Sequence, residues 1–337
     1  MATSSILRAL AFFALLFVQA IEAEARTIVD MSGRAVVLPE KASRVVTLGA
    51  VPVLNGFLFA FGEQDSIVNG LPTALARKYQ YVFAPGLAQK PIVQGAEKAL
   101  AVEEIVGLRP DVILTMDVAT AESLRSLRLP AIYLRWTAPD DVKTLMALLG
   151  EIFGKRGLAG EYAAYFDRTL ELVARRVGSS DGSERPRVLY VDLRRLTQPH
   201  RVADWWIARA GGRSLTDAPR DQESVTFSLE QMLAWDPQVL IVADRAEAEM
   251  AFHEPRLQNM SAIRDRRVYV APSGAHLWAN RTVEQPLTVI WAATIIHPEL
   301  FSLEELRAEM GAFYDRFFHT RLSREQIDDI LGGSGGR

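Results

Sequence analysis

The chain repeats one pattern of residues in its two halves. LAVEEIVGLRPDVILTMD begins at residue 100 and FSLEQMLAWDPQVLIVAD begins at residue 227, and each joins a short helical stretch, a proline and an apolar run. Proline ends a helix, and a short apolar run rich in β-branched residues after it is typical of a buried strand. We therefore expect one βα unit in each half, with a parallel sheet built around it.

The sequence around the two copies continues this alternation. Helical patterns lie between apolar runs that predict strands. These runs are at 44–48, 111–116, 130–136, 187–192, 238–244 and 267–272, with a shorter one at 66–70. The predicted fold class is α/β, with two βα lobes that have mainly parallel sheets.

Two helical segments separate the halves, at 140–154 and 157–177. In the second segment apolar residues recur at spacings of three and four, and a helix of about 20 residues spans about 30 Å. Such a helix is long enough to be a strut between the lobes. The predicted domains are an N-terminal lobe at 26–138, linking helices with the interlobe strut at 139–180, a C-terminal lobe at 181–331 and a flexible tail at 332–337.

The first 25 residues have the organisation of a secretory signal peptide. Arg8 is followed by an apolar stretch from Ala9 to Ala20, and Ala23-Glu24-Ala25 has the small residues of a cleavage site. A run of about 12 apolar residues is shorter than the roughly 20 that a membrane span needs. We expect residues 1–25 to be removed on export.

Cysteine content and charge limit the class of protein further. The chain has no cysteine, so it has no lipid-modified cysteine at the cleavage site, and two large lobes can fold without disulfides. The net charge is −3; residues 1–25 contribute −1, which leaves −2 for the exported chain. This balance argues against a nucleic-acid partner.

Enzyme signatures are missing from the sequence. There is no GxxxxGK[ST], GxGxxG, GxSxG or HExxH motif, and the five histidines show no local pair at metal-ligand spacing. We therefore expect a protein without catalytic residues, cofactor or metal site. An exported α/β enzyme is the alternative from another class, because Ser273 and His276 lie close in sequence; it would require a nucleophile and base paired in the cleft.

Six motifs connect the chain to a known family. In order along the chain they are TIVDMSGRAVVLP (27–39), VEEIVGLRPDVIL (102–114), AGG (210–212), SLEQMLAWDPQVLIV (228–242), AIRDRRVYVAP (262–272) and EQPLTVIWAATIIHPELF (284–301). With this set the chain resembles the periplasmic substrate-binding proteins of ABC importers for iron–siderophore complexes, haem and cobalamin. The resemblance implies a periplasmic protein with two lobes joined by one long α-helix, a ligand in the cleft between them, and small-angle closure. Nothing in the sequence requires more than a monomer.

The resemblance also implies a role for two glutamates in the repeated unit. In this family one surface glutamate from each lobe docks onto arginines of the ABC permease, and the matching residues are Glu103 and Glu230. Carboxylate–guanidinium pairs are directional, so two of them fix orientation. The alternative is that both are ordinary helix-start glutamates, favoured by the helix dipole and by a cap such as Ser228. A signalling module that presents its ligand to a receptor is a further alternative.

The ligand-binding residues should lie in loops at the carboxyl ends of the strands. These loops contain Tyr79, Tyr81, Trp136, Arg194, Arg195, Arg201, His276, Trp278 and Arg281. Aromatic walls with arginines suit a flat anionic metal chelate, so the expected ligand is a ferric siderophore. Haem, with Tyr79 or Tyr81 as iron ligand, cobalamin and a small oxyanion such as molybdate are the alternatives.

Two features near the expected cleft depart from the family. Many relatives have a glutamate at the start of the helix after the first strand, where this chain has Asn55 and Gly56. The loop at 71–91 is also longer than in the cobalamin binders. The aromatic candidates have a simpler interpretation as well, because tyrosine and tryptophan often bury the ring in a core and keep the polar tip wet.

Overall fold

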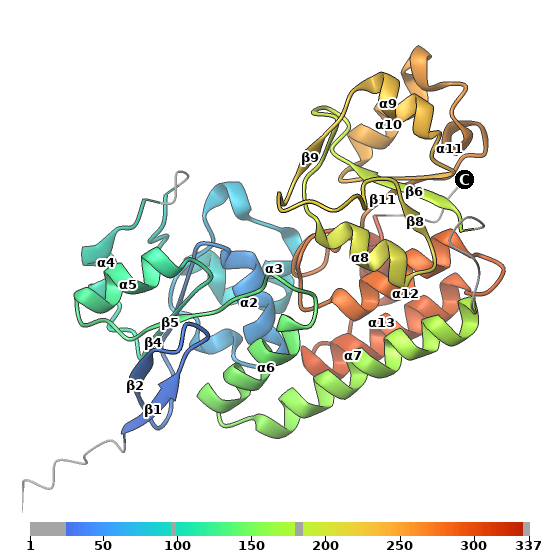
Figure 1. Cartoon of the computed structure of the whole chain (residues 1–337). Coiled ribbons are helices and arrows are strands. Elements are labelled where there is room, and N and C mark those ends of the chain that lie inside the picture. Colours follow the sequence, from blue (N-terminus) through green and yellow to red (C-terminus); the bar gives the residue numbers. More distant parts are fainter. Residues whose placement is uncertain (1–24, 96–98, 179–184, 333–337) are drawn as a thin grey trace, which may run out of the picture.

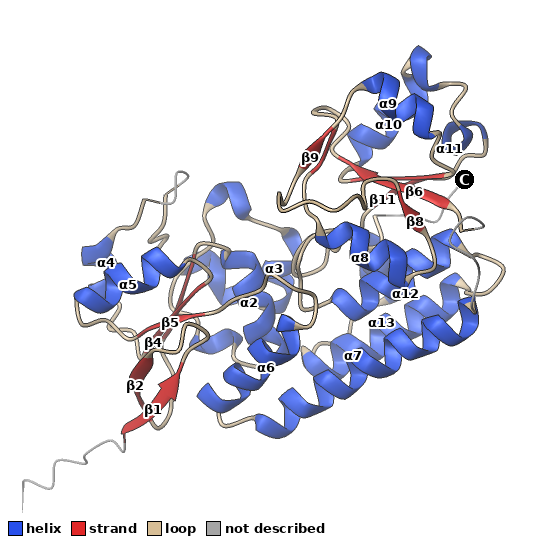
Figure 2. Ribbon diagram, viewed as in Figure 1, coloured by secondary structure: helices blue, strands red, loops and turns tan. Residues whose placement is uncertain are grey.

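The computed structural model describes residues 25–95, 99–178 and 185–332. Apart from Ala25 and Gly332, the predicted signal peptide and the predicted tail lie outside these residues. Figure 1 shows two lobes side by side above a long helix, and Figure 2 shows that each lobe has strands with helices packed around them.

The first lobe is built on a three-stranded parallel sheet in the order β3-β4-β5. The strands are β3 Val45–Leu48, β4 Val112–Thr115 and β5 Ala131–Tyr133. Every residue of β3 and β4 is buried, as expected for a parallel sheet covered on both faces. The covering helices are α2 Val51–Ala60, α3 Lys78–Phe83, α4 Val102–Gly107 and α5 Val118–Ser126, and a hairpin of β1 Ala25–Val29 and β2 Ala35–Pro39 precedes them.

The second lobe has a four-stranded parallel sheet in the order β11-β10-β6-β8. Its strands are β6 Arg187–Val191, β8 Arg213–Ser214, β10 Val239–Val242 and β11 Val268–Val270. Helices α8 Val202–Arg209, α9 Leu229–Trp235, α10 Arg245–His253 and α11 Ser261–Arg264 surround it, and β7 Thr197–Gln198 pairs with β9 Val225–Thr226 in a small antiparallel ribbon. The repeated sequence unit is therefore α4-β4 in one lobe and α9-β10 in the other.

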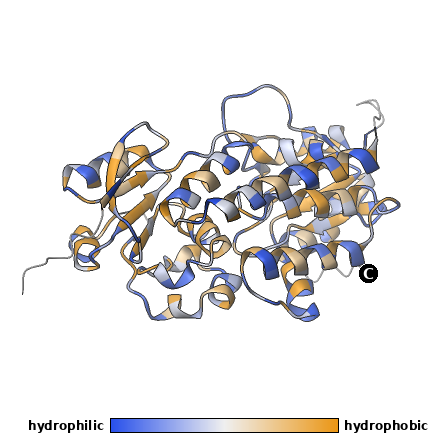
Figure 3. Cartoon of the chain, turned by 90° about the horizontal axis from the view of Figure 1, so that it is seen from below, coloured by the Kyte–Doolittle hydropathy of each residue, from blue (hydrophilic) through white to orange (hydrophobic). Residues whose placement is uncertain are grey.

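The strut is helix α7, Arg156–Val177. It runs beneath both lobes and packs against α6 Asp141–Ile152 and α12 Gln285–Ile296. Its buried positions recur every three or four residues, and in Figure 3 hydrophilic and hydrophobic positions alternate along the long helices. Helices α13 Leu303–Phe317 and α14 Arg324–Ile330 complete this layer. The predicted fold class, two βα lobes with mainly parallel sheets joined by one long helix, is confirmed.

One hydrophobic core crosses from lobe to lobe. Phe57 of the first lobe, Tyr162 of the strut and Trp206 of the second lobe belong to the same buried cluster, and all three are 0% exposed. Two smaller clusters lie on the other faces of the two sheets. The cleft walls are therefore extensions of a single packed interior.

A buried polar chain also joins the lobes. Thr47 Oγ1 donates to Asn55 Oδ1 at 2.9 Å, and Asn55 Nδ2 donates to Gln80 Oε1 at 3.1 Å. Gln80 Nε2 donates to the carbonyls of Pro52 at 2.9 Å and of Ala275, in the other lobe, at 2.6 Å. Asn55, where many relatives have a glutamate, thus belongs to the structural link between the lobes.

Some elements differ from the sequence-based expectation. The run at 66–70 forms only an isolated bridge between Ile67 and Val45, because the side chain of Asn69 takes both the N–H and the carbonyl of Thr47 that a further strand would pair. The long loop at 71–91 contains α3 and two 3₁₀ turns, Thr73–Leu75 and Pro85–Gln89. The segment before β11 contains a 3₁₀ turn at Pro255–Leu257 and the short helix α11.

We predict that replacing Gln80 by methionine, which has a similar volume, lowers the free energy of unfolding by about 2 kcal/mol, because buried carbonyls and an amide lose their partner. Gln258 offers a matched control, since its Nε2 also donates to two carbonyls but the residue is exposed. Gln258→Met should cost less than about 0.5 kcal/mol. Urea denaturation measures both variants, and equal losses would contradict the role assigned to Gln80.

Candidate ligand-binding cleft

Two cavities lie where the loops of the lobes meet. The first, called the Arg201 cavity, has a volume of about 390 Å³ and is lined by 137–139, Arg201 to Trp205, the loop at 217–220 and Arg281. The second, called the Arg77 cavity, also has a volume of about 390 Å³. Its lining comes from the start of α2, the loop at 72–77, Gln94, Asp117 and His276.

The fold explains why these residues meet. Gly49 follows β3 and has a φ of +78°, a backbone conformation that glycine adopts without strain, and the chain turns there into α2. The Gly49 N–H donates to Gln94 Oε1 at 2.6 Å, and this bond holds the loop that contains Gln94 beside the turn. In the other lobe the ribbon after β6 leads into α8, which starts at Val202. The carboxyl ends of parallel strands thus open onto the cleft, as in other α/β folds.

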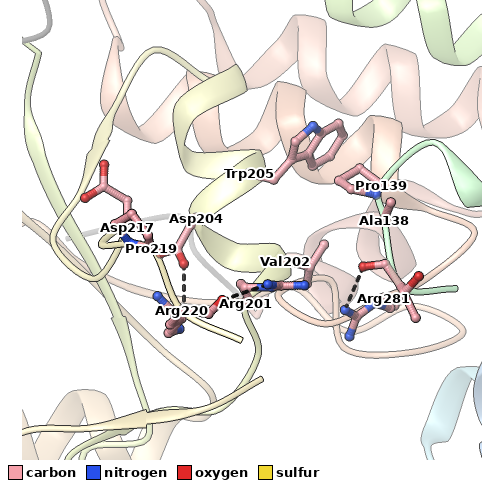
Figure 4. A pocket seen from close by; sticks show the side chains of 11 residues that line it. Ala138, Pro139, Arg201, Val202, Asp204, Trp205, Asp217, Pro219, Arg220 and Arg281 are labelled. Atoms are coloured by element: carbon pink, nitrogen blue, oxygen red, sulfur yellow. Dashed lines mark hydrogen bonds and ion pairs between the residues drawn. The ribbon is translucent and has the colours of Figure 1, made fainter. Parts of the chain in front are cut away.

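Arginines dominate the Arg201 cavity. In the view of Figure 4, Arg220, Arg201 and Arg281 lie along one side, with Trp205 on the other. Arg220 is paired with Asp204 at 2.7 Å. Arg201 Nη1 donates to the Arg220 carbonyl at 2.8 Å, and within the described parts of the chain Arg201 has no ion pair with a carboxylate. Its positive charge therefore stays available in the cavity.

Arg281 connects the two sides of the cleft. Its Nη2 and Nη1 donate to Glu223 at 2.7 and 3.0 Å, and Nη2 also approaches the Thr137 carbonyl at 3.4 Å. Thr137 follows β5 of the first lobe, whereas Arg281 and Glu223 belong to the second. One guanidinium therefore touches both walls.

Two histidines belong to this region: His276 lines the Arg77 cavity, and His200 directly precedes Arg201. Burial lowers the pKa of His276 to about 4, with smaller contributions from the positive charges of Arg77 and His200. Burial and the charge of Arg281 also lower the pKa of His200. Both rings are therefore neutral at pH 7, and a neutral imidazole offers one N–H donor. Both cavities lie where loops of the two lobes meet, and we call them together the cleft.

The structure places only part of the expected binding set at this cleft. Arg201, His276 and Arg281 line its cavities. Arg194 lies elsewhere, because it pairs with Asp244 and Glu247 at 3.0 Å beside α10. Arg195, also expected in the cleft, is exposed and pairs with Asp192.

The aromatic candidates pack into the protein, in contrast to the expected aromatic walls. Trp278 is 0% exposed, and Trp136 is 7% exposed with its ring 5.4 Å from that of Phe57. Tyr79 is 3% exposed, and Tyr81 packs against the main core.

The hydroxyl of Tyr79 is also occupied. It donates to the Gln326 carbonyl and to Asp329 Oδ2, each at 2.8 Å, and burial followed by this carboxylate raises its pKa. A phenol held in this way does not present its oxygen to an iron in the cleft.

Sequence reasoning missed Arg77, His200 and Glu223 as cleft residues. Arg77 comes from the loop at 71–91, whose length was the available signal. His200 directly precedes Arg201, and adjacency to that candidate was the signal there. Glu223 lies in the loop between β8 and β9, and nothing in the local sequence indicates its pairing with Arg281, 58 positions away.

The two docking candidates are exposed and lie far from the cleft. Glu103 is in the first turn of α4 and Glu230 in the first turn of α9, and Figure 1 shows these helices at the outer ends of the two lobes. The capping box of α9 is completed by Ser228 and Gln231. The Glu230 backbone N–H and the Ser228 hydroxyl lower the pKa of the Glu230 carboxyl, so this side chain is charged.

Within residues 25–95, 99–178 and 185–332, no helix is both long and apolar enough to cross a membrane. No group of three or more histidine or acidic side chains in these ranges is arranged to hold a metal ion.

Comparison with known proteins places these features in context. The periplasmic binding protein family matches residues 56–275. The molybdate-binding protein MolA of Haemophilus influenzae is 24% identical over 324 residues, which cover 88% of this chain and 91% of that protein. A cobalamin-binding protein of Halobacterium salinarum is 26% identical over 264 residues, covering 76% of this chain and 69% of that protein.

Solved structures show the same architecture. A periplasmic solute binding protein from Veillonella parvula superimposes with a TM-score of 0.81 at 24% identity, covering 92% of this chain and 98% of that one. Haemophilus influenzae MolA bound to molybdate gives a TM-score of 0.76 at 21% identity, covering 88% of this chain and 99% of that one.

The buried His276 predicts a dependence of stability on pH. Its pKa in the fold is about 4 instead of 6.5, so between these values the unfolded chain binds a proton that the folded chain does not. The free energy of unfolding should therefore fall as pH drops from 6.5 to 4, by up to about 1.4 kcal/mol per pH unit. His276→Asn should remove this component in urea titrations, while His253→Asn, exposed at the end of α10, should not. Identical pH profiles for wild type and His276→Asn would contradict the prediction.

Proposed function

This chain belongs to the periplasmic binding protein family, and we propose that it captures a compact oxyanion of the molybdate type between its lobes and delivers it to an ABC permease. The proposal includes an exported chain without residues 1–25, acting as a periplasmic monomer and performing no chemical step. Its ligand contacts come from Arg77, Arg201, His276 and Arg281.

The observation that carries the proposal is a pair of arginines in the cleft, one from each lobe. Arg77 and Arg201 have no ion pair with a carboxylate within the described residues. A guanidinium offers parallel N–H donors that match the oxygens of an oxyanion, and it stays charged at any physiological pH. One such group from each lobe would suit a multiply charged anion held between the lobes.

Backbone groups support the same choice. Helix α2 begins at the Arg77 cavity and α8 begins at the Arg201 cavity. The amino end of a helix carries a partial positive charge, which favours anions, even though Pro52 has no N–H and the N–H groups of Val53, Ala203 and Asp204 already donate to backbone carbonyls. The neutral rings of His200 and His276 each add one possible donor without adding a cation.

The same cleft is less suited to a flat chelate. Trp136, Trp278 and Tyr79, which would form aromatic walls, are buried. The cavity walls instead contain arginine, histidine and backbone groups, and Trp205 is the one tryptophan, tyrosine or phenylalanine among the described residues that line them. A ferric siderophore stays the second candidate, because the cationic cleft also fits the anionic oxygens of a chelate. The resemblance to MolA, which is named for molybdate, agrees with the first choice.

The ligand can be identified with a binding panel. We predict saturable binding of molybdate or tungstate by isothermal titration calorimetry, and weaker or no binding of sulfate, a ferric siderophore, haem and cobalamin. Arg77→Gln and Arg201→Gln should each weaken oxyanion binding by about tenfold or more, since each removes charge-assisted hydrogen bonds. Arg209→Gln, at the opposite end of α8 from Arg201, is the matched control and should bind like wild type.

The panel also separates the alternatives. Binding of only the siderophore, haem or cobalamin would replace the oxyanion with that ligand. Absence of binding across the panel would remove the proposed role of the cleft. A catalytic turnover of any panel compound would favour the exported enzyme.

We also propose that Glu103 and Glu230 dock the loaded protein onto the permease. Reversing both to arginine should reduce uptake in cells at least tenfold, because like charges then face the permease arginines, while ligand affinity stays unchanged. Glu104→Arg is the matched control, since Glu104 is also exposed in the first turn of α4. Undiminished uptake by the double variant would favour a protein that presents its ligand to a receptor.

A further inference from the structure

We propose that Glu223 competes with the bound oxyanion for Arg281 and thereby sets the affinity of the cleft. The inference rests on the proposed function and adds a residue that limits binding instead of promoting it. In this proposal the Glu223 carboxylate is an internal anion, and an incoming ligand must displace it from Arg281.

The geometry of the pair supports this role. Glu223 Oε1 and Oε2 accept from Nη2 and Nη1 of Arg281 at 2.7 and 3.0 Å, the two-pronged arrangement that an oxyanion would also adopt. The Arg281 side chain is 19% exposed, whereas that of Glu223 is 47% exposed. The cation is thus fixed within the cleft and its carboxylate partner approaches from the solvent side.

The surroundings of Glu223 are positively charged on several sides. Its hydrogen bonds to Arg281 lower its pKa most, and the charges of Arg201 and His200 lower it further, against the opposing effect of burial. The carboxylate therefore lies near guanidinium groups from two sequence segments, those of Arg201 and Arg281. This is the electrostatic environment that would attract an external anion.

The loop that carries Glu223 is anchored on both sides of a short exposed stretch. Before it, Arg220 pairs with Asp204 and is only 10% exposed. After it, β9 pairs with β7 through Thr226 and Val225. Residues 221–224 between these anchors are all exposed. Displacing Glu223 therefore requires movement of a few surface residues and leaves both anchors intact.

Competition of this kind reduces apparent affinity in proportion to the fraction of molecules in which Arg281 is engaged. Removing the charge of Glu223 should free Arg281 and tighten oxyanion binding. The effect should disappear when Arg281 itself is removed, because the two residues act on the same interaction.

The test measures the dissociation constant for molybdate, and for tungstate, by titration calorimetry on the full exported chain. E223Q should bind about tenfold more tightly than wild type. D221N removes a charge two positions away in the same exposed stretch and should change affinity less than about twofold. In the R281Q background, adding E223Q should have no further effect. Thermal unfolding of each variant shows that it is folded.

Each outcome has a defined meaning. Tighter binding by E223Q that is lost in the R281Q background supports the inference. If the wild type binds an oxyanion and E223Q binds it equally or more weakly, the inference is overturned while the proposed function stands. Equal tightening by D221N also overturns it, because a general charge effect then explains the result. If neither wild type nor E223Q binds any oxyanion, the proposed function fails and the inference fails with it.

Discussion

The uninterrupted hydrophobic core is the constraint on which the rest of the molecule depends. Phe57, Tyr162 and Trp206 come from three different parts of the chain and share one buried cluster. Separating the lobes would expose this cluster to water at roughly 25 cal/mol for each Å² of apolar surface. The cleft walls are therefore held at a nearly fixed separation. A preformed site of this kind loses less ordering free energy on binding than a site that must be assembled.

The polar groups in and beside this core divide into two kinds. The chain from Thr47 through Asn55 and Gln80 to the Ala275 carbonyl has its hydrogen bonds satisfied within the protein, and it contributes to lobe alignment. Arg77 and Arg201 are different, because their charge is not neutralised by carboxylates in the described residues. Exposed arginines without a partner are unremarkable on a surface, but two that face one cleft create a local field that favours anions.

The sequence was sufficient for the features that depend on local patterns. A continuous apolar run after a proline predicted β4 and β10, and spacings of three and four predicted the strut α7, because buried parallel strands and amphipathic helices impose those patterns on their own residues. The two helix starts at Glu103 and Glu230 followed from the repeated unit in the same way. Asn69 shows the limit of such patterns, since its side chain replaces the strand pairing expected at 66–70.

The cleft depended on contacts that no local pattern encodes. A loop has no sequence periodicity, so the sequence does not indicate whether a tryptophan ring in a loop contacts a ligand or packs in the core. Trp136 and Trp278 are both buried. Arg194 was expected beside the ligand, but Asp244 and Glu247, about 50 positions away, bind it. The partnership of Arg281 with Glu223 and Thr137 is equally remote in sequence. Long-range pairing decides which arginines remain available, and it appears only when the lobes are assembled.

The shared core also has a consequence for how cargo is given up. Walls that belong to one interior would not swing wide apart to release the proposed oxyanion, so its exit would depend on how quickly its ionic contacts break. For the proposed oxyanion, release to a permease would then require a competing charge or the return of Glu223 to Arg281. Release of the proposed ligand would then be an exchange of one anion for another at a preformed site.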